Sequence, residues 1–261
     1  MTTGTIMIII KHWELIKHLT QKEIKARYKQ SFLGFFWVVL SPFFQMLIMS
    51  FIFSKVMRVN DLGVPYPVYL YAGLLPWLFF ANSLQNATEE LVENASLIKK
   101  IYFPREILVL SALLAKTFDF ALSTLIFLLL MMWYRIPFTP YMLLFLPLFA
   151  LQFLFTYGVS LFLAATNLFY RDVRYLLSLV ITLWFYLTPV IYATEFFPPE
   201  YRWIFQINPM SVFINAYRQI LLTNGLPNFP SLGIGVLVSV IIFAISLQIF
   251  RRLEGMFADV A

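Results

Sequence analysis

Long stretches without a charged side chain recur along the sequence and predict its architecture. A helix needs about 20 apolar residues to cross a bilayer. Six stretches reach this length once the proline-rich starts of two of them are left out. They cover residues 30–54, 62–88, 107–134, 141–166, 175–194 and 231–250. Only the third carries charges, which are Lys116 and Asp119. The pattern therefore predicts an all-α, polytopic membrane protein with six transmembrane helices.

The segment between the fifth and sixth of these stretches is apolar but interrupted by prolines and charges. Its longest uncharged run, residues 203–217, is too short to cross a bilayer. Asn208 followed by Pro209 predicts a helix N-cap and a proline in the first helical position. Gly225 predicts a helix stop. We expect two half-helices that enter the membrane and return on the same side, a re-entrant hairpin. The alternative is a tilted seventh span.

The N-terminal segment, residues 11–29, has the pattern of an amphipathic helix. At 100° per residue, one face collects Lys11, His18, Lys22, Lys25 and Lys29. The opposite face collects Trp13, Ile16, Leu19, Thr20 and Ile24. Such a helix lies in the membrane interface with its lysines toward water and lipid phosphates. We therefore divide the chain into an interface helix, residues 1–30, and a transmembrane domain, residues 31–261.

The composition supports a membrane protein and excludes several kinds of site. Hydrophobic residues make up 61% of the chain and charged residues 12%, against about 25% in soluble domains. The absence of cysteine excludes disulfides and cysteine metal sites. His12 and His18 are interpreted as solvated side chains, so no metal site is expected.

The distribution of lysine and arginine predicts the orientation. Thirteen of the 19 lie in the N-terminus, the second-to-third loop, the fourth-to-fifth loop and the C-terminus, and five lie on the other side. The positive-inside rule then places both termini in the cytoplasm. The net charge of +6 follows from this topology and does not indicate nucleic acid.

Lys116 and Asp119 are three residues apart and share one face of the third predicted span. Lys116 lies about 15 Å into the membrane if the helix begins near Glu106. Charges at this depth are costly and usually paired. An intrahelical ion pair that supports helix packing and a proton or ion relay of a secondary transporter both fit the spacing.

Aromatic side chains are dense in the first and fifth spans. They either face lipid and neighbouring helices or line a pore, where rigid rings offer weak contacts to sugar rings. The candidate lining residues are Phe35, Phe36, Trp37, Phe43, Phe44, Trp184, Phe185 and Tyr186.

Sequence motifs for catalysis are absent. The chain contains no GxxxxGK[ST] phosphate loop, no HExxH and no GxSxG, and we expect neither an enzyme nor a bound cofactor. Any ATP-driven work must then come from another subunit. A secondary transporter would show interrupted spans in matching halves, and only one interrupted segment is present.

Six stretches resemble one family. They are LGFFWVVLSPFFQ (33–45), YLYAGLLPWLFFANSLQNAT (69–88), NASLIKKIYFPREIL (94–108), NLFYRDVRYL (167–176), the region 189–222 and the terminal RRLEGMFADV. Together they are similar to ABC-2 type permeases that export lipid-linked polysaccharides such as O-antigen, capsule or teichoic acid. A permease for small amphiphiles or drugs is the alternative within the same family.

The resemblance implies a homodimer in the cytoplasmic (inner) membrane, with two copies of a separate cytoplasmic ATPase that binds ATP and Mg²⁺. The substrate would be a polyprenyl-linked glycan in contact with membrane lipid. The coupling residues toward the ATPase would be Asn94, Ser96, Leu97, Lys99, Lys100, Tyr102, Phe103 and Pro104. The re-entrant hairpin would border the exit. Lys25, Arg27 and Lys29 at the cytoplasmic mouth are candidates for attracting the lipid pyrophosphate.

Overall fold

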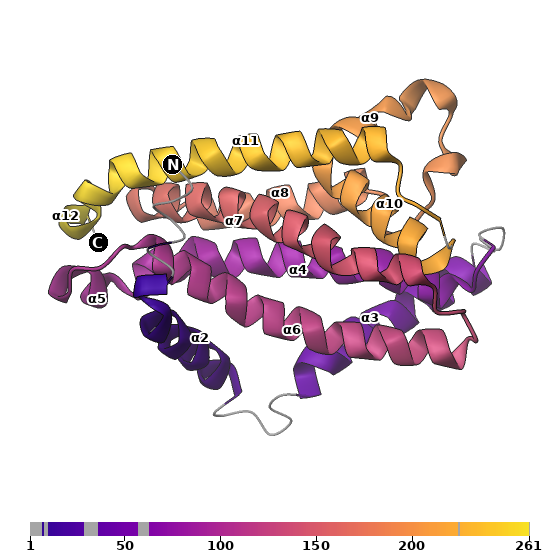
Figure 1. Cartoon of the computed structure of the whole chain (residues 1–261), viewed down its shortest axis with the longest axis horizontal. Helices are drawn as coiled ribbons and strands as arrows, with labels where there is room; N and C mark the ends of the chain where they lie inside the picture. Colours follow the sequence, from indigo (N-terminus) through magenta and orange to yellow (C-terminus); the bar gives the residue numbers. More distant parts are fainter. Residues whose placement is uncertain (1–6, 8–9, 29–35, 57–62, 224, 261) are drawn as a thin grey trace.

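The computed structural model describes residues 7, 10–28, 36–56, 63–223 and 225–260. Within these ranges every regular element is helical, which confirms the all-α class (Figure 1). The longer helices are α2 Trp13–Tyr28, α3 Phe36–Phe51, α4 Tyr66–Glu93, α6 Glu106–Trp133, α7 Phe145–Phe169, α8 Val173–Leu187 and α11 Phe229–Leu253. The shorter ones are α5 Ala95–Lys100, α9 Trp203–Ile207, α10 Pro209–Leu222 and α12 Phe257–Val260. A π-helical turn, Ile52–Val56, and four 3₁₀ turns complete the list.

Helix α4 forms the centre of the bundle. Its neighbours are α3, α6, α7, α8 and α10. Stacked aromatic pairs tie α4 to them, with ring centroids 5.9 Å apart for Tyr71 and Phe127 and 5.6 Å apart for Phe80 and Phe155. Ring pairs of this geometry add to the free energy gained from burial alone. The packing therefore makes α4 the element against which the other helices are positioned.

Each predicted span corresponds to a helix, although the lengths differ. Among the described residues, three helical segments are long and apolar enough to cross a membrane: Glu106–Trp133, Pro140–Phe169 and Phe229–Val260. Leu40–Ser54 and Val173–Leu187 are shorter apolar helices. Helix α4 has 28 residues but contains tyrosine, tryptophan and proline, and most of it is covered by protein. Because its neighbours shield it, α4 does not need the apolar surface that lipid contact demands.

Helix α8 ends seven residues earlier than the predicted fifth span. Thr188 precedes Pro189 and adopts an extended conformation with ψ 135°. The proline ring disfavours helical geometry in the residue before it, so the helix stops at Leu187. The chain then turns back toward α4, where the Tyr66 hydroxyl donates a hydrogen bond to the Ile191 carbonyl at 2.6 Å.

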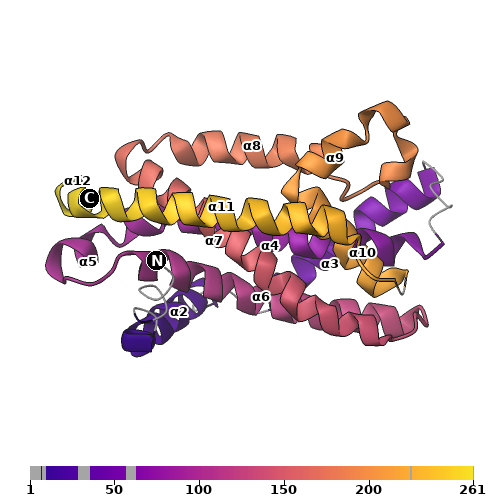
Figure 2. The same cartoon turned by 45° about the horizontal axis from the view of Figure 1, so that its top comes forward.

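The interrupted segment forms two short helices, α9 and α10, as the proline and asparagine pattern predicts. The Asn208 side chain accepts a hydrogen bond from the Met210 amide, and Pro209 occupies the first helical position. Asn208 also accepts a hydrogen bond from the Trp184 indole at 3.0 Å, which links the hairpin to α8. Both short helices lie at the end of the bundle opposite α5 and α12 (Figure 2).

Gly158 allows α7 to approach α11 closely. A Cβ atom added there would lie 2.8 Å from the Phe243 Cα and 2.9 Å from its amide nitrogen. These are backbone atoms, so the two helices would have to separate to accept a side chain. Small residues serve this purpose wherever membrane helices pack backbone to backbone.

We expect Gly158→Ala to destabilise the bundle by about 1–3 kcal/mol, the usual cost of overpacking. The measurement is the thermal unfolding midpoint of the protein in detergent. Gly233→Ala in α11 is the matched control, because no atom lies within 4 Å of its added Cβ. Equal midpoints for the two variants would contradict the close contact.

Candidate functional site

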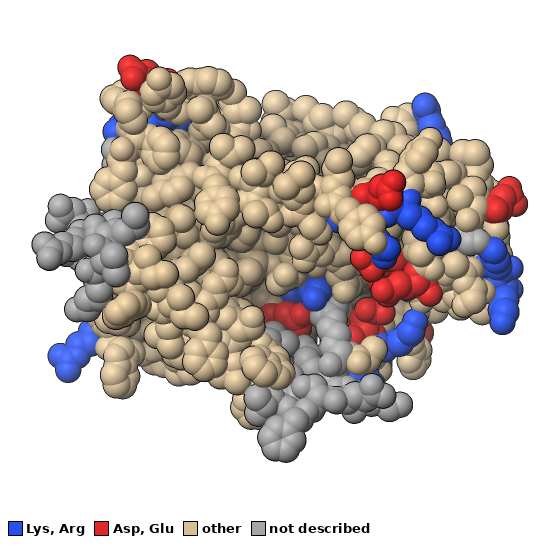
Figure 3. Space-filling view, turned by 180° about the vertical axis from the view of Figure 1, so that it is seen from behind, with Lys and Arg blue, Asp and Glu red and all other residues tan. Residues whose placement is uncertain are grey.

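Charged side chains gather at one end of the molecule. Figure 3 shows most of the lysine, arginine, aspartate and glutamate atoms of one face at the end that carries α5 and α12, while the middle is largely uncharged. An apolar body with a charged end is the surface expected when lipid surrounds the middle and water the ends. The predicted coupling residues lie at this charged end.

Asn94 joins α4 to α5, and its side chain forms hydrogen bonds with Glu90 and Lys22. Its Nδ2 donates to the Glu90 carbonyl at 3.0 Å and to the Glu90 Oε1 at 2.8 Å. Its Oδ1 accepts a hydrogen bond from the Lys22 Nζ of α2 at 2.9 Å. These bonds attach the N-terminal amphipathic helix to the start of α5. Asn94 thus holds three helices together at one point.

The segment after Asn94 divides into an exposed and a buried set. The Tyr102 side chain is 90% exposed and Ile101 is 55% exposed. Lys99, Lys100 and Ser96 are exposed as well, whereas Leu97 and Pro104 are partly covered. Phe103, in contrast, is only 4% exposed and packs in the core cluster that includes Ile107 and Ile98. The structure therefore brings Lys99, Lys100 and Tyr102 to the surface together and places Phe103 in the interior.

Two ion pairs that the sequence did not reveal secure this end of the bundle. The Arg251 guanidinium of α11 lies 3.0 Å from the Glu106 carboxylate at the start of α6. The Arg105 guanidinium lies 3.7 Å from Glu254, whose Oε1 also accepts a hydrogen bond from the Arg105 amide at 2.8 Å. The partners are about 145–149 positions apart, so no local pattern could have identified them.

The basic residues proposed for the lipid pyrophosphate are described only in part. Lys25 lies on α2 and is exposed. The Arg27 side chain and all of Lys29 lie outside the described residues. The buried face of α2 consists of Ile16 and Leu19, which pack in the same cluster as Phe103.

The candidate channel residues do not share one environment. Phe36, Trp37, Phe44 and Tyr186 are exposed. Trp184 and Phe185 pack against α4, with ring centroids 5.1 Å from Phe80 and 5.5 Å from Trp77, respectively. Phe43 is partly buried against the core, and Phe35 lies outside the described residues. Among the candidates that the structure describes, these four exposed rings are the most accessible to a ligand, and Phe43, Trp184 and Phe185 are partly covered.

Lys116 and Asp119 face each other on α6. The Lys116 Nζ lies 3.8 Å from the Asp119 Oδ2, and both side chains are mostly covered. The spacing that indicated a shared helical face therefore produces a direct ion pair.

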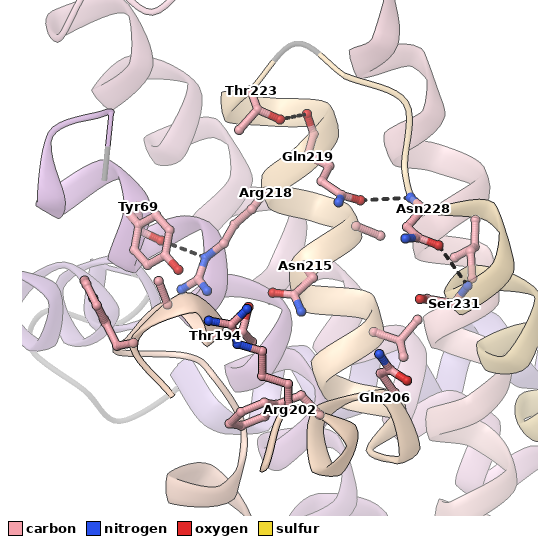
Figure 4. A pocket seen from close by; sticks show the side chains of 16 residues that line it. Tyr69, Thr194, Arg202, Gln206, Asn215, Arg218, Gln219, Thr223, Asn228 and Ser231 are labelled. Carbon is pink, nitrogen blue, oxygen red and sulfur yellow. Dashed lines mark hydrogen bonds between the residues drawn. The ribbon is translucent and has the colours of Figure 1, made fainter. Parts of the chain in front are cut away.

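A cavity of about 520 Å³ lies at the opposite end, between α10, the start of α11 and the segment before α9. Asn215, Gln219 and Arg218 of α10 line it together with Arg202, Gln206, Asn228 and Ser231 (Figure 4). Amides, hydroxyls and guanidinium groups provide donors and acceptors for a polar ligand. The sequence predicted the hairpin but not this cavity.

Arg218 is buried at the wall of this cavity. Its NH1 and NH2 donate hydrogen bonds of 2.6 Å to the carbonyls of Pro189 and Val190. Its guanidinium also lies over the Tyr69 ring, 3.7 Å from the centroid. One side chain thus connects α10, α4 and the chain segment that follows α8.

The comparisons with known proteins cover nearly the whole chain. A family model described as ABC-2 type transporter matches residues 14–222. The chain is 35% identical over 250 residues to the O-antigen export system permease protein RfbA of Klebsiella pneumoniae, which covers 95% of each chain. It is 33% identical over 248 residues to RfbA of Myxococcus xanthus, covering 94% of each. It is 21% identical over 243 residues to the polysialic acid transport protein KpsM of Escherichia coli, covering 92% of this chain and 93% of KpsM.

Proposed function

Because the chain belongs to the ABC-2 type transporter family, we propose that it is the membrane-spanning permease subunit of an ABC exporter for a lipid-linked polysaccharide. The observation that carries the proposal is end-to-end similarity to permeases named for O-antigen export. The relative named for polysialic acid transport supports the same class of substrate. The permease is not itself the ATPase, so a separate subunit supplies the ATP hydrolysis.

The permease acts as a homodimer with two copies of the ATPase. The surface toward the ATPase consists of the exposed residues Ser96, Lys99, Lys100, Ile101 and Tyr102. Its support is the combination of an exposed aromatic ring, an exposed aliphatic side chain and two lysines at the charged end of an apolar bundle. Phe103, Leu97 and Asn94 take part by holding this surface in place.

Helices α3, α4, α6, α7, α8 and α11 cross the cytoplasmic membrane, with both chain termini in the cytoplasm. The hairpin of α9 and α10 then lies at the outer face and borders the exit. The charged end around α5, opposite the hairpin, supports this orientation. Lys25, with Arg27 and Lys29, attracts the lipid pyrophosphate from the cytoplasmic side.

Helix α8 contributes a wall of the glycan route. Its exposed residues cover one broad face, on which Leu179 lies between two stripes of different character. One stripe is aromatic and hydroxylic and consists of Tyr175, Ser178, Thr182 and Tyr186. The other is aliphatic and consists of Leu176, Val180, Leu183 and Leu187. The first stripe faces the sugar chain, because hydroxyls and aromatic ring faces both suit carbohydrate. The exposed rings of Phe36, Trp37 and Phe44 on α3 complete the lining.

The test is deletion of this chain in cells that still synthesise the polysaccharide. We expect the cell surface to lose the polysaccharide and the lipid-linked precursor to accumulate in the cytoplasmic membrane. Expression of the chain together with its ATPase restores export. Unchanged surface polysaccharide after deletion would contradict the proposal and favour a permease for small amphiphiles.

A further inference from the structure

Helix α4 is buried along most of its length but leaves one stripe uncovered. Between Leu70 and Leu91, the residues that are not buried are Leu78, Asn82, Gln85, Asn86 and Glu89. Steps of three and four residues place them on one face of the helix, and Glu93 extends that face to the end of α4. Apart from Leu78 the stripe is polar. Amides and carboxylates in contact with lipid hydrocarbon are costly, so lipid is an unsuitable neighbour for this face.

A groove of about 260 Å³ follows the stripe. Its lining residues are Asn82, Gln85, Asn86, Glu89, Glu93 and Lys116. Asn82 lies eleven residues before Glu93, which is about 16 Å deeper in the bundle at the rise of an α-helix. Figure 3 shows acidic and basic atoms within a hollow in the otherwise uncharged middle of one face. The groove therefore extends from the charged end into the membrane-spanning part of the molecule.

The groups along the groove suit a hydroxyl-rich ligand. The Asn86 Nδ2 is buried and has no hydrogen-bond partner in the described part of the chain. Asn82 and Gln85 present exposed amides, and Glu89 presents a carboxylate. A sugar hydroxyl both donates and accepts, so it pairs with either kind of group.

The charges of the groove disfavour an anion. Glu89 and Glu93 line it, and the Lys116 Nζ lies 3.8 Å from the Asp119 Oδ2. Two carboxylates, beside a lysine that is already paired with a third, would repel a phosphate.

We propose that this groove binds uncharged, hydroxyl-rich sugar residues of the exported glycan in the cytoplasmic half of the permease. The proposal rests on the proposed function as a polysaccharide exporter. Sugar hydroxyls donate to Glu89 and accept from Asn82, Gln85 and Asn86. The lipid pyrophosphate binds elsewhere, so the groove holds the glycan and not its anchor.

Photo-crosslinking in membranes of cells that make the polysaccharide tests the proposal. The photoreactive residue p-benzoylphenylalanine replaces Gln85 on the groove or, as the matched control, Leu237 on α11, which is also exposed. The probe is the cell's own lipid-linked polysaccharide, detected with an antibody against it. We expect irradiation to attach polysaccharide to the chain at position 85 and not at position 237. The proposal would be overturned if position 85 captured a second copy of this chain and no polysaccharide, or if it captured nothing.

A substitution provides an independent measurement. Gln85→Met keeps the length of the side chain but removes its hydrogen bonds, and we expect export to fall by about 2- to 10-fold, the range for one lost hydrogen bond. Leu237→Met should leave export unchanged. Normal export by Gln85→Met would contradict a role in sugar binding. If deletion of the whole chain blocks export while Gln85→Met exports normally and position 85 captures no glycan, the groove proposal fails and the proposed function stands.

Discussion

Replacing Tyr102 by aspartate is expected to abolish export and to release the ATPase from the permease, while the chain itself stays folded. The ring is 90% exposed, and its centroid lies 5.1 Å from the Arg105 guanidinium, a surface contact whose loss costs the fold little. Aromatic anchors at the centre of an interface typically contribute about 2 kcal/mol or more, which corresponds to a loss of at least about 30-fold in affinity. A carboxylate in place of the ring would also have to be desolvated on docking.

The measurement is co-purification of the ATPase with the tagged permease, followed by detection of surface polysaccharide. Tyr201→Asp is the matched control, because Tyr201 is exposed in the segment before α9, at the opposite end. Retention of the ATPase by Tyr102→Asp at the level of this control would remove Tyr102 from the interface. Phe103→Asp is unsuitable for the comparison, since it places a charge in the core and is expected to prevent folding.

Replacing Arg218 by alanine is expected to cause the largest loss of stability among single substitutions at the hairpin. The carbonyls of Pro189 and Val190 would lose their charged donors in a buried position. A hydrogen bond to a charged group contributes about 1.5–3 kcal/mol, so we expect a total cost of several kcal/mol. Arg218→Lys should recover little of it, because one ammonium group does not reproduce the two-pronged contact.

Thermal unfolding in detergent measures this effect. Arg202→Ala serves as the control, because Arg202 is exposed and makes a 3.0 Å hydrogen bond to the Phe197 carbonyl from the same cavity wall. The control should unfold within a few degrees of the unaltered protein. Equal midpoints for Arg218→Ala and Arg202→Ala would show that the buried bonds contribute little.

Features that depend on neighbouring residues were predictable from the sequence. The charge-free stretches predicted where the long helices lie, and Asn208 with Pro209 predicted the start of α10 because capping needs only adjacent positions. The premature end of α8 was also locally encoded, since Pro189 follows Thr188 directly. Counting uncharged residues did not detect this helix end, because threonine and proline are uncharged and do not interrupt such a stretch.

Features that depend on distant contacts were not predictable. Phe103 and Tyr102 are adjacent aromatic residues in the same motif, yet one packs against α6 and the other faces solvent. The pairing of Arg251 with Glu106 requires α11 to end beside the start of α6, which hydrophobicity cannot specify. The polar stripe of α4 was partly visible as glutamates near the end of a span, but its continuity with Asn82 and Gln85 emerges only when neighbours cover the remaining faces.

The contacts of the α4–α5 junction determine how a force applied to α5 would be transmitted to the rest of the protein. Lys22 of α2 bonds to Asn94 at the junction. Arg105, in the segment after α5, pairs with Glu254 just after α11. Arg251 of α11 pairs with Glu106 at the start of α6. A load applied to α5 therefore reaches four helices at once. In the proposed exporter, the charged end of the bundle would therefore move as one rigid body, and the force from the ATPase would rotate the bundle as a whole.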